Sequence, residues 1–454
     1  MQAGRNLVIA TAALISGCLS LEDRPADPVF PADAAFTLDL PVLGTTAANS
    51  ADWWQRATEG PVLAQLQQAL ETNVRLRQAE AEVAAARAQR DQARADRGPD
   101  VTASADLGVS KTSGSDPTNS RGIGIDADLP LDVGGALALR EEAALNLWKA
   151  RREEARQLRS DIARNFLLAV VDGAEATARD QLLSQQIEAS QTLLRLIELR
   201  FTQGLASSVD VLQQRDELAS LRQQIPLAQR DLRTAQNRLR ELSGRTPDAT
   251  VGVLFDGMPA IATAFAPATP LELLQRRPDL LALQARLAAA DARFAAALAD
   301  RLPTLSLSGR AVTRVASGDV TTLIGAVLDA AFTVFDSGGK EAIAEEQRAR
   351  LAAAGHDYLA TWIERVIEID DLANDEASLR ERIGLSGQRL ETAEALLQAA
   401  RRRYERGVSD YLPVLAALRG LQQQQRDHLS LRADLGRTRI RLHDGLGTPQ
   451  RETG

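Results

Sequence analysis

The sequence RFTQG at positions 200–204 returns as RYERG at positions 403–407, a shift of 203 residues. Two more pairs recur at a shift of 204, namely ADRGP at 95–99 with ADRLP at 299–303, and DVGG at 132–135 with DSGG at 336–339. A shared Ala- and Arg-rich composition could align helices by chance, but it does not explain turn-forming Gly and Pro residues at a nearly constant offset. The chain is therefore predicted to contain one structure built twice.

Each copy contains two stretches with a period of two residues. At 101–109 and 123–131 every odd position is apolar, whereas the even positions are polar residues, Gly or Pro. This alternation predicts strands with one apolar face, so hairpins are expected at about 101–132 and 304–335. Strands of about ten residues can cross a bilayer when tilted, but a barrel needs about eight of them. A membrane position would require several chains to pool their hairpins; a soluble sheet packed on helices is the alternative.

The segment that follows the first hairpin predicts an unusually long helix. Positions 136–203 are mostly strong helix formers, with no Pro and one Gly, and at about 1.5 Å per residue they span about 100 Å. A second long helix is expected at 339–406, and shorter helices are expected at 62–97, 209–243, 271–301 and 409–446. Two short helices laid end to end match one long helix, which predicts four helical columns per chain. Their Ala-rich composition favours close approach around a hollow tube.

The N-terminus reads as an export signal. Residues 1–17 contain Arg5, an apolar run and a small Ser-Gly pair directly before Cys18, the only cysteine. This pattern predicts a lipoprotein signal peptide with lipid attached to Cys18; an ordinary signal with a chance cysteine is the alternative. Leu19 and Ser20 follow the cysteine, with no Asp beside it. This pattern resembles that of bacterial lipoproteins that are sorted to the outer membrane. The Pro-containing segment 18–50 is expected to be an extended, lipid-anchored tether.

Composition excludes several function classes. The formal net charge is -8, which is unlike a nucleic-acid-binding surface. Three His residues and one Cys cannot supply a Cys/His zinc site, a disulfide or a Cys-His catalytic pair, and no nucleotide-binding glycine signature is present. We therefore expect no enzyme activity, no cofactor and no metal site. A periplasmic hydrolase is the enzyme alternative, but its pocket would need converging polar groups.

The remaining boundaries follow from these elements. The predicted organisation is a first repeat at 51–243 with its turn at about 204–208, a linker at 244–270, a second repeat at 271–446 with its turn at about 407–410, and a tail at 447–454. A lipid-anchored periplasmic coiled-coil scaffold or adaptor would share the anchor and the helices. It would give no reason for apolar hairpins of membrane-spanning length at matched positions.

The lipoprotein signal, the two copies of helix, hairpin, long helix, turn and helix, the stretch LQRRPDL at 274–280 and the Arg-aromatic-x-x-Gly turns together resemble the TolC family. The likeness is to its lipoprotein branch, the OprM-like or NodT-type outer membrane factors, and covers about 50–447. It implies a mainly α homotrimer with a twelve-stranded outer-membrane β-barrel and a helical periplasmic tunnel. It also implies that the protein serves as the exit duct of a tripartite efflux system. The other two components would be a periplasmic adaptor (membrane fusion) protein and an inner-membrane transporter of RND type. The stretch 276–279 can also simply start a helix.

The two Gly turns are the predicted periplasmic tips. Gly204 and Gly407 can reverse the chain without steric cost, and Ser207 and Ser409 are suitable starts for the next helices. The resemblance implies that these tips form both the constriction and the adaptor-docking surface, with Val408 among the docking residues. Plain helix-turn-helix connections are the alternative.

The composition of the gate departs from the family pattern. The resemblance implies an apolar residue five positions past the second Gly and carboxylates six or nine positions past it. These positions hold Leu412, Pro413 and Ala416, so the apolar residue is kept and both carboxylates are missing. The candidate gate residues are therefore Leu412, Asp210 and Asp410, with Arg403 or Arg406 as ionic partners.

The polar face of the hairpins is the predicted lumen of the barrel. Asp106, Asp126 and Asp128 share the parity opposite to the apolar face, and a confined ring of carboxylates attracts cations. Arg310 and Arg314 have the same inward parity in the second hairpin and oppose this effect. The balance predicts a lumen that prefers cations.

Overall fold

The structure is a computed structural model of the whole chain. It describes residues 27–31, 34–37, 52–111, 113, 118–250, 255, 257–265, 269–316 and 319–447. The predicted signal peptide at 1–17, the predicted lipid-attachment residue Cys18, most of the tether and the tail beyond 447 lie outside the described residues.

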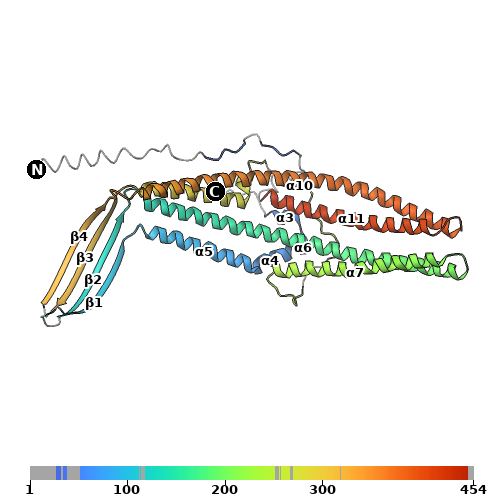
Figure 1. Cartoon of the computed structure of the whole chain (residues 1–454), viewed down its shortest axis with the longest axis horizontal. Helices are drawn as coiled ribbons and strands as arrows, with labels where there is room; N and C mark the ends of the chain where they lie inside the picture. Colours follow the sequence, from blue (N-terminus) through green and yellow to red (C-terminus); the bar gives the residue numbers. More distant parts are fainter. Residues whose placement is uncertain are drawn as a thin grey trace. The chain divides into compact units, whose positions relative to one another are not determined.

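Apart from one additional short helix at the start of the first repeat, the elements follow one another in the same order in both repeats (Figure 1). The first repeat contains α3 (Trp53–Ala57), α4 (Gly60–Thr72), α5 (Val74–Ala95), β1 (Asp100–Ser110), β2 (Thr118–Leu131), α6 (Ala136–Thr202) and α7 (Ser208–Leu242). The second contains α8 (Leu273–Arg276), α9 (Pro278–Ala299), β3 (Thr304–Ala316), β4 (Asp319–Ala331), α10 (Gly339–Glu405) and α11 (Leu412–Gly445). The long helices α6 and α10 have 67 residues each.

Local chemistry explains where these helices begin. Asp132 and Asp336 open the repeated Asp-x-Gly-Gly marks, and each carboxylate accepts hydrogen bonds of 2.8 to 3.1 Å from two backbone N–H groups further along the chain. Gly135 and Gly338 have φ of 74° and 84°, a backbone region that favours Gly. The marks are therefore start signals for the two long helices.

Two expected helices are divided. The helix predicted at 271–301 is α8 and α9, with the extended residue Arg277 between them. The helix predicted at 62–97 is two helices, α4 and α5, which meet at Asn73. Asn73 Oδ1 accepts from the N–H groups of Arg75 and Leu76 at 2.9 and 3.1 Å, and its amide donates to the carbonyl of Leu242 at 2.7 Å. Because Asn caps helices well, it can end one helix and start the next.

The chain divides into two compact units that cut across the repeats. The sheet unit comprises residues 1–30, 79–155 and 279–361, and the tip unit comprises residues 31–78, 156–278 and 362–454. Each unit thus contains parts of both repeats, because α6 and α10 each contribute residues to both. None of the described helices combines the length and the hydrophobicity that a bilayer crossing requires.

The sheet unit contains one four-stranded antiparallel sheet in the order β1-β2-β3-β4. The register pairs Ile125 with Ala103 on one side and Ala311 on the other, so the predicted apolar positions share one face. This face is exposed within the single chain, with Leu107 88% and Ile324 78% exposed. An apolar sheet face without a protein cover needs another apolar environment.

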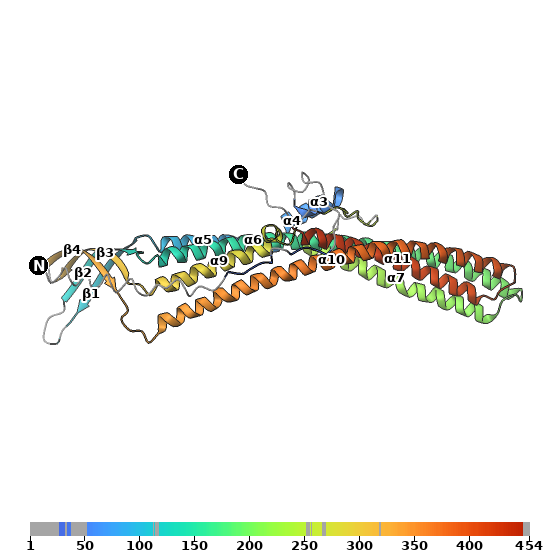
Figure 2. The same ribbon diagram turned by 90° about the horizontal axis from the view of Figure 1, so that it is seen from above.

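The tip unit has its main core around α3, the first helix among the described residues. Trp53 and Trp54 are 1% and 3% exposed and pack with α4, α6 and α11. Trp53 Nε1 donates to Ser160 Oγ at 2.6 Å, and Ser160 Oγ donates to Asp444 at 2.6 Å. Away from this core, α7 lies alongside α6 and α11 alongside α10 (Figure 2).

Candidate functional site

Both tip turns have the same backbone geometry. Gly204 and Gly407 each have φ of 71°, and the residue after each Gly donates its N–H to the carbonyl of the repeated Arg. These bonds, Leu205 to Arg200 and Val408 to Arg403, are 2.8 and 3.0 Å long. They close the helix ends as in a Schellman motif. The repeated Arg-aromatic-x-x-Gly mark is therefore a helix stop, which supplies no chemistry by itself.

The two turns lead into their next helices differently. In the first turn Ser207 is the N-cap of α7, and Asp210 completes a capping box, its carboxylate accepting from the Ser207 N–H at 2.9 Å. In the second turn the sequence pattern placed the helix start at Ser409, but α11 begins at Leu412 with Tyr411 as N-cap and Pro413 in its first turn. Pro suits the first turn of a helix, where its missing N–H loses no intrahelical hydrogen bond, so the start moves past Ser409.

The candidate gate residues are only partly brought together. Asp210 is engaged at the start of α7, whereas Asp410 is exposed in the other turn. Arg403 and Arg406 are also exposed, and no ion pair joins either Arg to either Asp in the part of the chain that the structure describes. Leu412 is 60% exposed. Within one chain, the described residues therefore do not form the ion pairs expected for Asp210 and Asp410.

A buried hydrogen-bond chain instead joins the two helical hairpins at the tip. We call Tyr411, Gln214 and Ser190 the tip clasp; they are 1%, 0% and 0% exposed. The Tyr411 hydroxyl donates to Gln214 Oε1, and Gln214 Nε2 donates to Ser190 Oγ at 2.6 Å and to its carbonyl at 2.9 Å. The clasp connects α6, α7 and the start of α11. Every bond in it is removed from water, so losing one partner leaves a polar group unsatisfied.

Electrostatic contacts reinforce the clasp. Burial, and then the charge of Glu217, raises the pKa of Tyr411 above its usual value, which keeps the phenol neutral and able to donate. Glu217 on α7 is itself almost buried, with 8% of its side chain exposed, and pairs with Arg419 on α11. On the facing helices, the Arg200 guanidinium lies 4.5 Å from the centre of the Tyr404 ring.

Apolar side chains are exposed at both tips. Leu205 and Val408 directly follow the two turn glycines and are 61% and 66% exposed. Val209 and Leu412, five positions past each Gly, are 56% and 60% exposed. The matched exposure in both repeats gives the tips an apolar surface available to a partner.

The predicted lumen face carries more balanced charge than the sequence suggests. Arg310 Nε lies 2.5 Å from Asp126, and Arg314 lies 3.6 Å from Asp106, across Gly122 on the strand between them. A Cβ at Gly122 would come within 2.4 Å of the Asp106 carboxylate, so Gly leaves the room that this pair needs.

The third carboxylate has a different partner. Asp128 accepts a 2.7 Å hydrogen bond from Ser308 Oγ and belongs to none of the ion pairs found among the described residues. The cation preference remains a prediction that rests mainly on Asp128 and on the net charge. Replacing Asp106 or Asp126 with Arg would leave Arg314 or Arg310 without its ion-pair partner. Neither position can therefore serve as the control for an Arg substitution on the apolar face.

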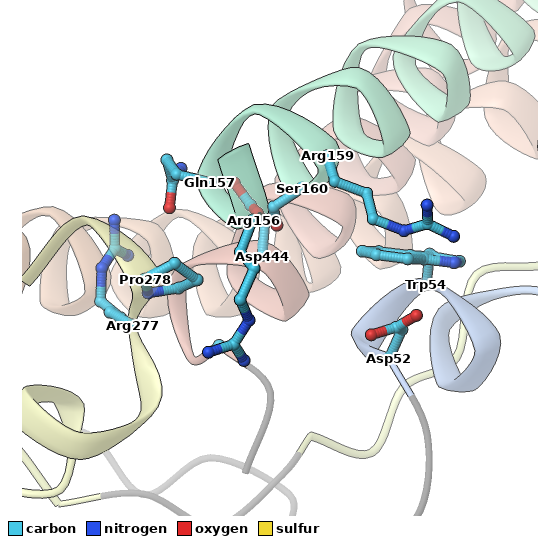
Figure 3. Close-up of a pocket in the computed structure, with 10 residues that line it drawn as sticks. Asp52, Trp54, Arg156, Gln157, Arg159, Ser160, Arg277, Pro278 and Asp444 are labelled. Atoms are coloured by element: carbon cyan, nitrogen blue, oxygen red, sulfur yellow. Dashed lines mark hydrogen bonds between the residues drawn. The ribbon is translucent and has the colours of Figure 1, made fainter. Parts of the chain in front are cut away.

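The stretch LQRRPDL at 274–280 has a structural role at the start of α9. Pro278 starts α9, and the buried Arg277 donates to the carbonyl of Gly445 at 2.8 Å. Close by, Asp444, Ser160 and Trp54 line a cavity of about 50 Å³, where Arg159 extends over the Trp54 ring (Figure 3). This cavity has room for water but not for a transported molecule. Among the described residues, no three potential ligands are grouped to hold a metal.

Sequence patterns did not identify the tip clasp. The available signal was a polar residue in a row of apolar ones on a single helix face. Gln214 lies between Val211 and Leu218 on the buried side of α7. Its partner Tyr411 is 197 residues away, so the pairing depends on how the two helical hairpins pack.

Comparison with known proteins agrees with this geometry. The family described as outer membrane efflux protein matches residues 65–245 and 269–448, one segment in each repeat. Outer membrane protein OprJ of Pseudomonas aeruginosa is 29% identical over 436 residues, which cover 90% of this chain and 88% of OprJ. Cation efflux system protein CusC of Escherichia coli is 26% identical over 455 residues, covering 97% and 98%.

Solved structures share the fold over most of the chain. A crystal structure of CusC has a TM-score of 0.84 at 25% identity, covering 93% of this chain and 98% of that chain. The outer-membrane channel OprN has a TM-score of 0.83 at 27% identity, covering 93% and 99%. The predicted fold class and the likeness to outer membrane factors are thereby confirmed, and these relatives are channels rather than enzymes. The chain belongs to the outer membrane efflux protein family and is an efflux channel of the outer membrane.

Proposed function

We propose that three copies of the chain form the exit duct of a tripartite efflux system. The observation that carries this proposal is the sheet, whose outer face is apolar and whose edge strands, β1 and β4, have no further partner among the described residues. Unpaired strand edges are not tolerated in lipid, so β4 of one copy pairs with β1 of the next until the barrel closes. Three sheets of four strands give the twelve-stranded barrel that the family resemblance implies.

The number of copies can be measured directly. The detergent-extracted protein, weighed by native mass spectrometry, is expected to have three times the mass of one mature chain. A protein that remains monomeric in the same detergent, with its helices intact by circular dichroism, would contradict the pooled barrel.

We further propose that the tips bind a periplasmic adaptor, which connects the duct to an inner-membrane transporter of RND type. The exposed apolar residues after both turn glycines support a docking role for Gly204, Gly407 and Val408. Asp410 and Leu412 are proposed to narrow the closed tip, and Asp210 to hold the start of α7 beside them. A bulky substitution at Val408 should impair efflux while leaving the conductance of the isolated trimer unchanged.

The tip clasp is proposed to hold the duct closed. Tyr411→Phe removes the hydroxyl that bonds to Gln214 and leaves a buried amide oxygen unpaired, at a cost of about 1–3 kcal/mol. Because the closed arrangement loses this stabilisation, the single-channel conductance of the isolated trimer should rise. Tyr358→Phe is the matched control, since it deletes the hydroxyl of another buried Tyr, in the sheet unit. Equal conductance in the Tyr411→Phe variant and the parent would place the constriction elsewhere.

Cys18 is proposed to be the acylated N-terminus, with the anchor secondary to the barrel. Acyl chains hold a protein at one leaflet, whereas the pooled sheets would span the membrane. A Cys18→Ala form, exported through a cleavable signal, should still be recovered as trimer from outer-membrane fractions. Recovery of this form only from the soluble periplasm would mean that the lipid, not the barrel, holds the protein in place.

A further inference from the structure

A buried histidine near the end of α11 has no part in the proposed efflux function. His443 is 2% exposed, and its Nε2–H donates to the carbonyl of Ala262 at 3.1 Å. The imidazole also packs against the ring of Phe265, with 4.6 Å between the ring centres. Ala262 and Phe265 belong to the linker between the two repeats, predicted at 244–270. His443 therefore attaches this linker to α11.

The linker segment 257–265 is attached to two helices. Phe265 is fully buried, and the N–H of Ala262 donates to the carbonyl of Ala57, at the end of α3, at 3.0 Å. Ala262 is thus held from both sides, by α3 through its N–H and by His443 through its carbonyl. The segment itself carries no titratable side chain. A response of this attachment to pH must therefore come from the residues that surround it.

The surroundings of His443 disfavour a positive charge on its ring. Burial is the main reason, and it lowers the pKa of His443 from its ordinary value of 6.5 to about 4. The hydrogen bond to the linker carbonyl opposes this shift, whereas the positive charges of Arg56 on α3 and Arg439, one turn earlier on α11, add to it. Arg277 brings a further cation to this end of α11, because it donates to the carbonyl of Gly445. The ring thus lies among cations.

Carboxylates from three neighbouring positions do not offset these cations, because they act on other groups. Glu376 on α10 pairs with Arg439 at 3.0 Å, and Asp444 on α11 pairs with Arg164 on α6. Asp52, the residue before α3, acts on the arginine of that helix and favours its charged form. Among the described residues, a proton on the imidazole therefore adds a positive charge that no carboxylate balances.

We propose that His443 is an acid-sensitive latch, which holds the linker on α3 and α11 while its ring is neutral and releases the linker when the ring is protonated. A protonated imidazole can still donate to Ala262, but it would bring an uncompensated charge into a site closed to water. After release the ring is hydrated and titrates near its ordinary value. All the groups involved lie in the tip unit, so the latch does not depend on the proposed barrel.

The direction of the pH dependence follows from the two states of the ring. The latched form has the lower pKa, so it binds fewer protons than the released form between pH 4 and 6.5. Its stability is therefore complete above about pH 6.5 and is lost progressively as the pH falls toward 4. Over this interval the ratio of latched to released linker should fall on the order of 100-fold, since the ratio changes by up to about tenfold per pH unit.

A spin label on the linker tests the latch. Thr263 lies between Ala262 and Phe265 and is exposed, so a nitroxide on Thr263→Cys does not enter the buried contacts. The protein is exported through a cleavable signal and purified as Cys18→Ala, which leaves the new cysteine as the single labelling site. We expect the electron paramagnetic resonance spectrum to show slow nitroxide motion at pH 7.5 and fast motion at pH 4.5, with a reversible transition between them.

Two variants on α11 separate His443 from other titrating groups. In His443→Gln the amide can donate to Ala262 but does not titrate, so slow motion is expected at both pH values. His428→Gln is the matched control, because His428 is a half-buried histidine on the same helix whose Nδ1 lies 3.3 Å from Ser386 Oγ on α10. This variant should keep the transition of the parent.

Three results would overturn the latch. The first is equal nitroxide motion at the two pH values in the parent, whether slow or fast. The second is fast motion at pH 4.5 in His443→Gln, which would assign the acid response to other groups. The third is a loss of helical circular dichroism with the same midpoint, which would mean that the helices unfold together with the linker.

Discussion

Leu107→Arg is expected to destabilise the membrane-inserted protein by about 2–4 kcal/mol if the site lies near the bilayer midplane. Leu107 lies on the outer face of β1 and is 88% exposed within one chain, so in the proposed barrel it faces acyl chains. A guanidinium in that position loses its hydration without gaining a partner. Urea titration of the trimer refolded in vesicles, followed by its shift in gel mobility, would measure the cost.

The control for this substitution comes from the opposite face. Ser104 lies on the inner face of the same strand, opposite Gly124, and takes part in no ion pair found among the described residues. Ser104→Arg would face the aqueous lumen and should shift the midpoint much less than Leu107→Arg. Equal effects at the two positions would indicate a sheet in a uniform environment, as on a soluble protein.

Arg419→Met should destabilise the tip by about 3 kcal/mol. The carboxylate of Glu217 is almost fully buried, and Arg419 is the cation that pairs with it. Removing one partner of a buried ion pair costs about 3–5 kcal/mol, and the lower end applies because Arg419 is itself 48% exposed. Since the pair joins α7 to α11, thermal unfolding of the trimer should begin at a lower temperature.

Two variants test whether the stranded charge is the cause. Adding Glu217→Gln to Arg419→Met removes the charge and should recover much of the loss. Arg215→Met, also on α7, breaks a pair whose Arg and Glu side chains are 59% and 40% exposed, and should cost about 0–1 kcal/mol. A similar loss in Arg215→Met and Arg419→Met would rule out burial as the source of the effect.

Features set by local chemistry could be predicted from the sequence. The Asp-x-Gly-Gly marks act through hydrogen bonds within a few residues, and the Gly turns act through a single backbone conformation. Both features can therefore be recognised in the local sequence of each repeat. Alternation also predicted which side chains share the apolar face of the sheet, because the side-chain period of a strand is independent of its neighbours. The start of α11 was placed wrongly because Ser409 is a good cap by type, whereas Pro413 and the buried Tyr411 decide the position.

Features that depend on register or packing between distant segments could not be predicted in this way. The parity of Arg310 and Asp126 was visible in the sequence, but their pairing required the alignment of β2 with β3, which are separated in the sequence by the helices α6 to α9. The tip clasp is more remote still, since Gln214 and Tyr411 belong to different repeats. Asp210 has the residue type expected of a gate, yet its carboxylate is used to start a helix.

The central claim, that copies of this chain form a continuous aqueous duct through a membrane, is tested most directly by the conductance of the purified protein in a planar lipid bilayer. Insertion of assembled trimers is predicted to produce discrete current steps of uniform size, and Tyr411→Phe trimers should produce larger steps. Folded protein that binds the bilayer without producing any steps, in both the parent and the Tyr411→Phe variant, would contradict the claim.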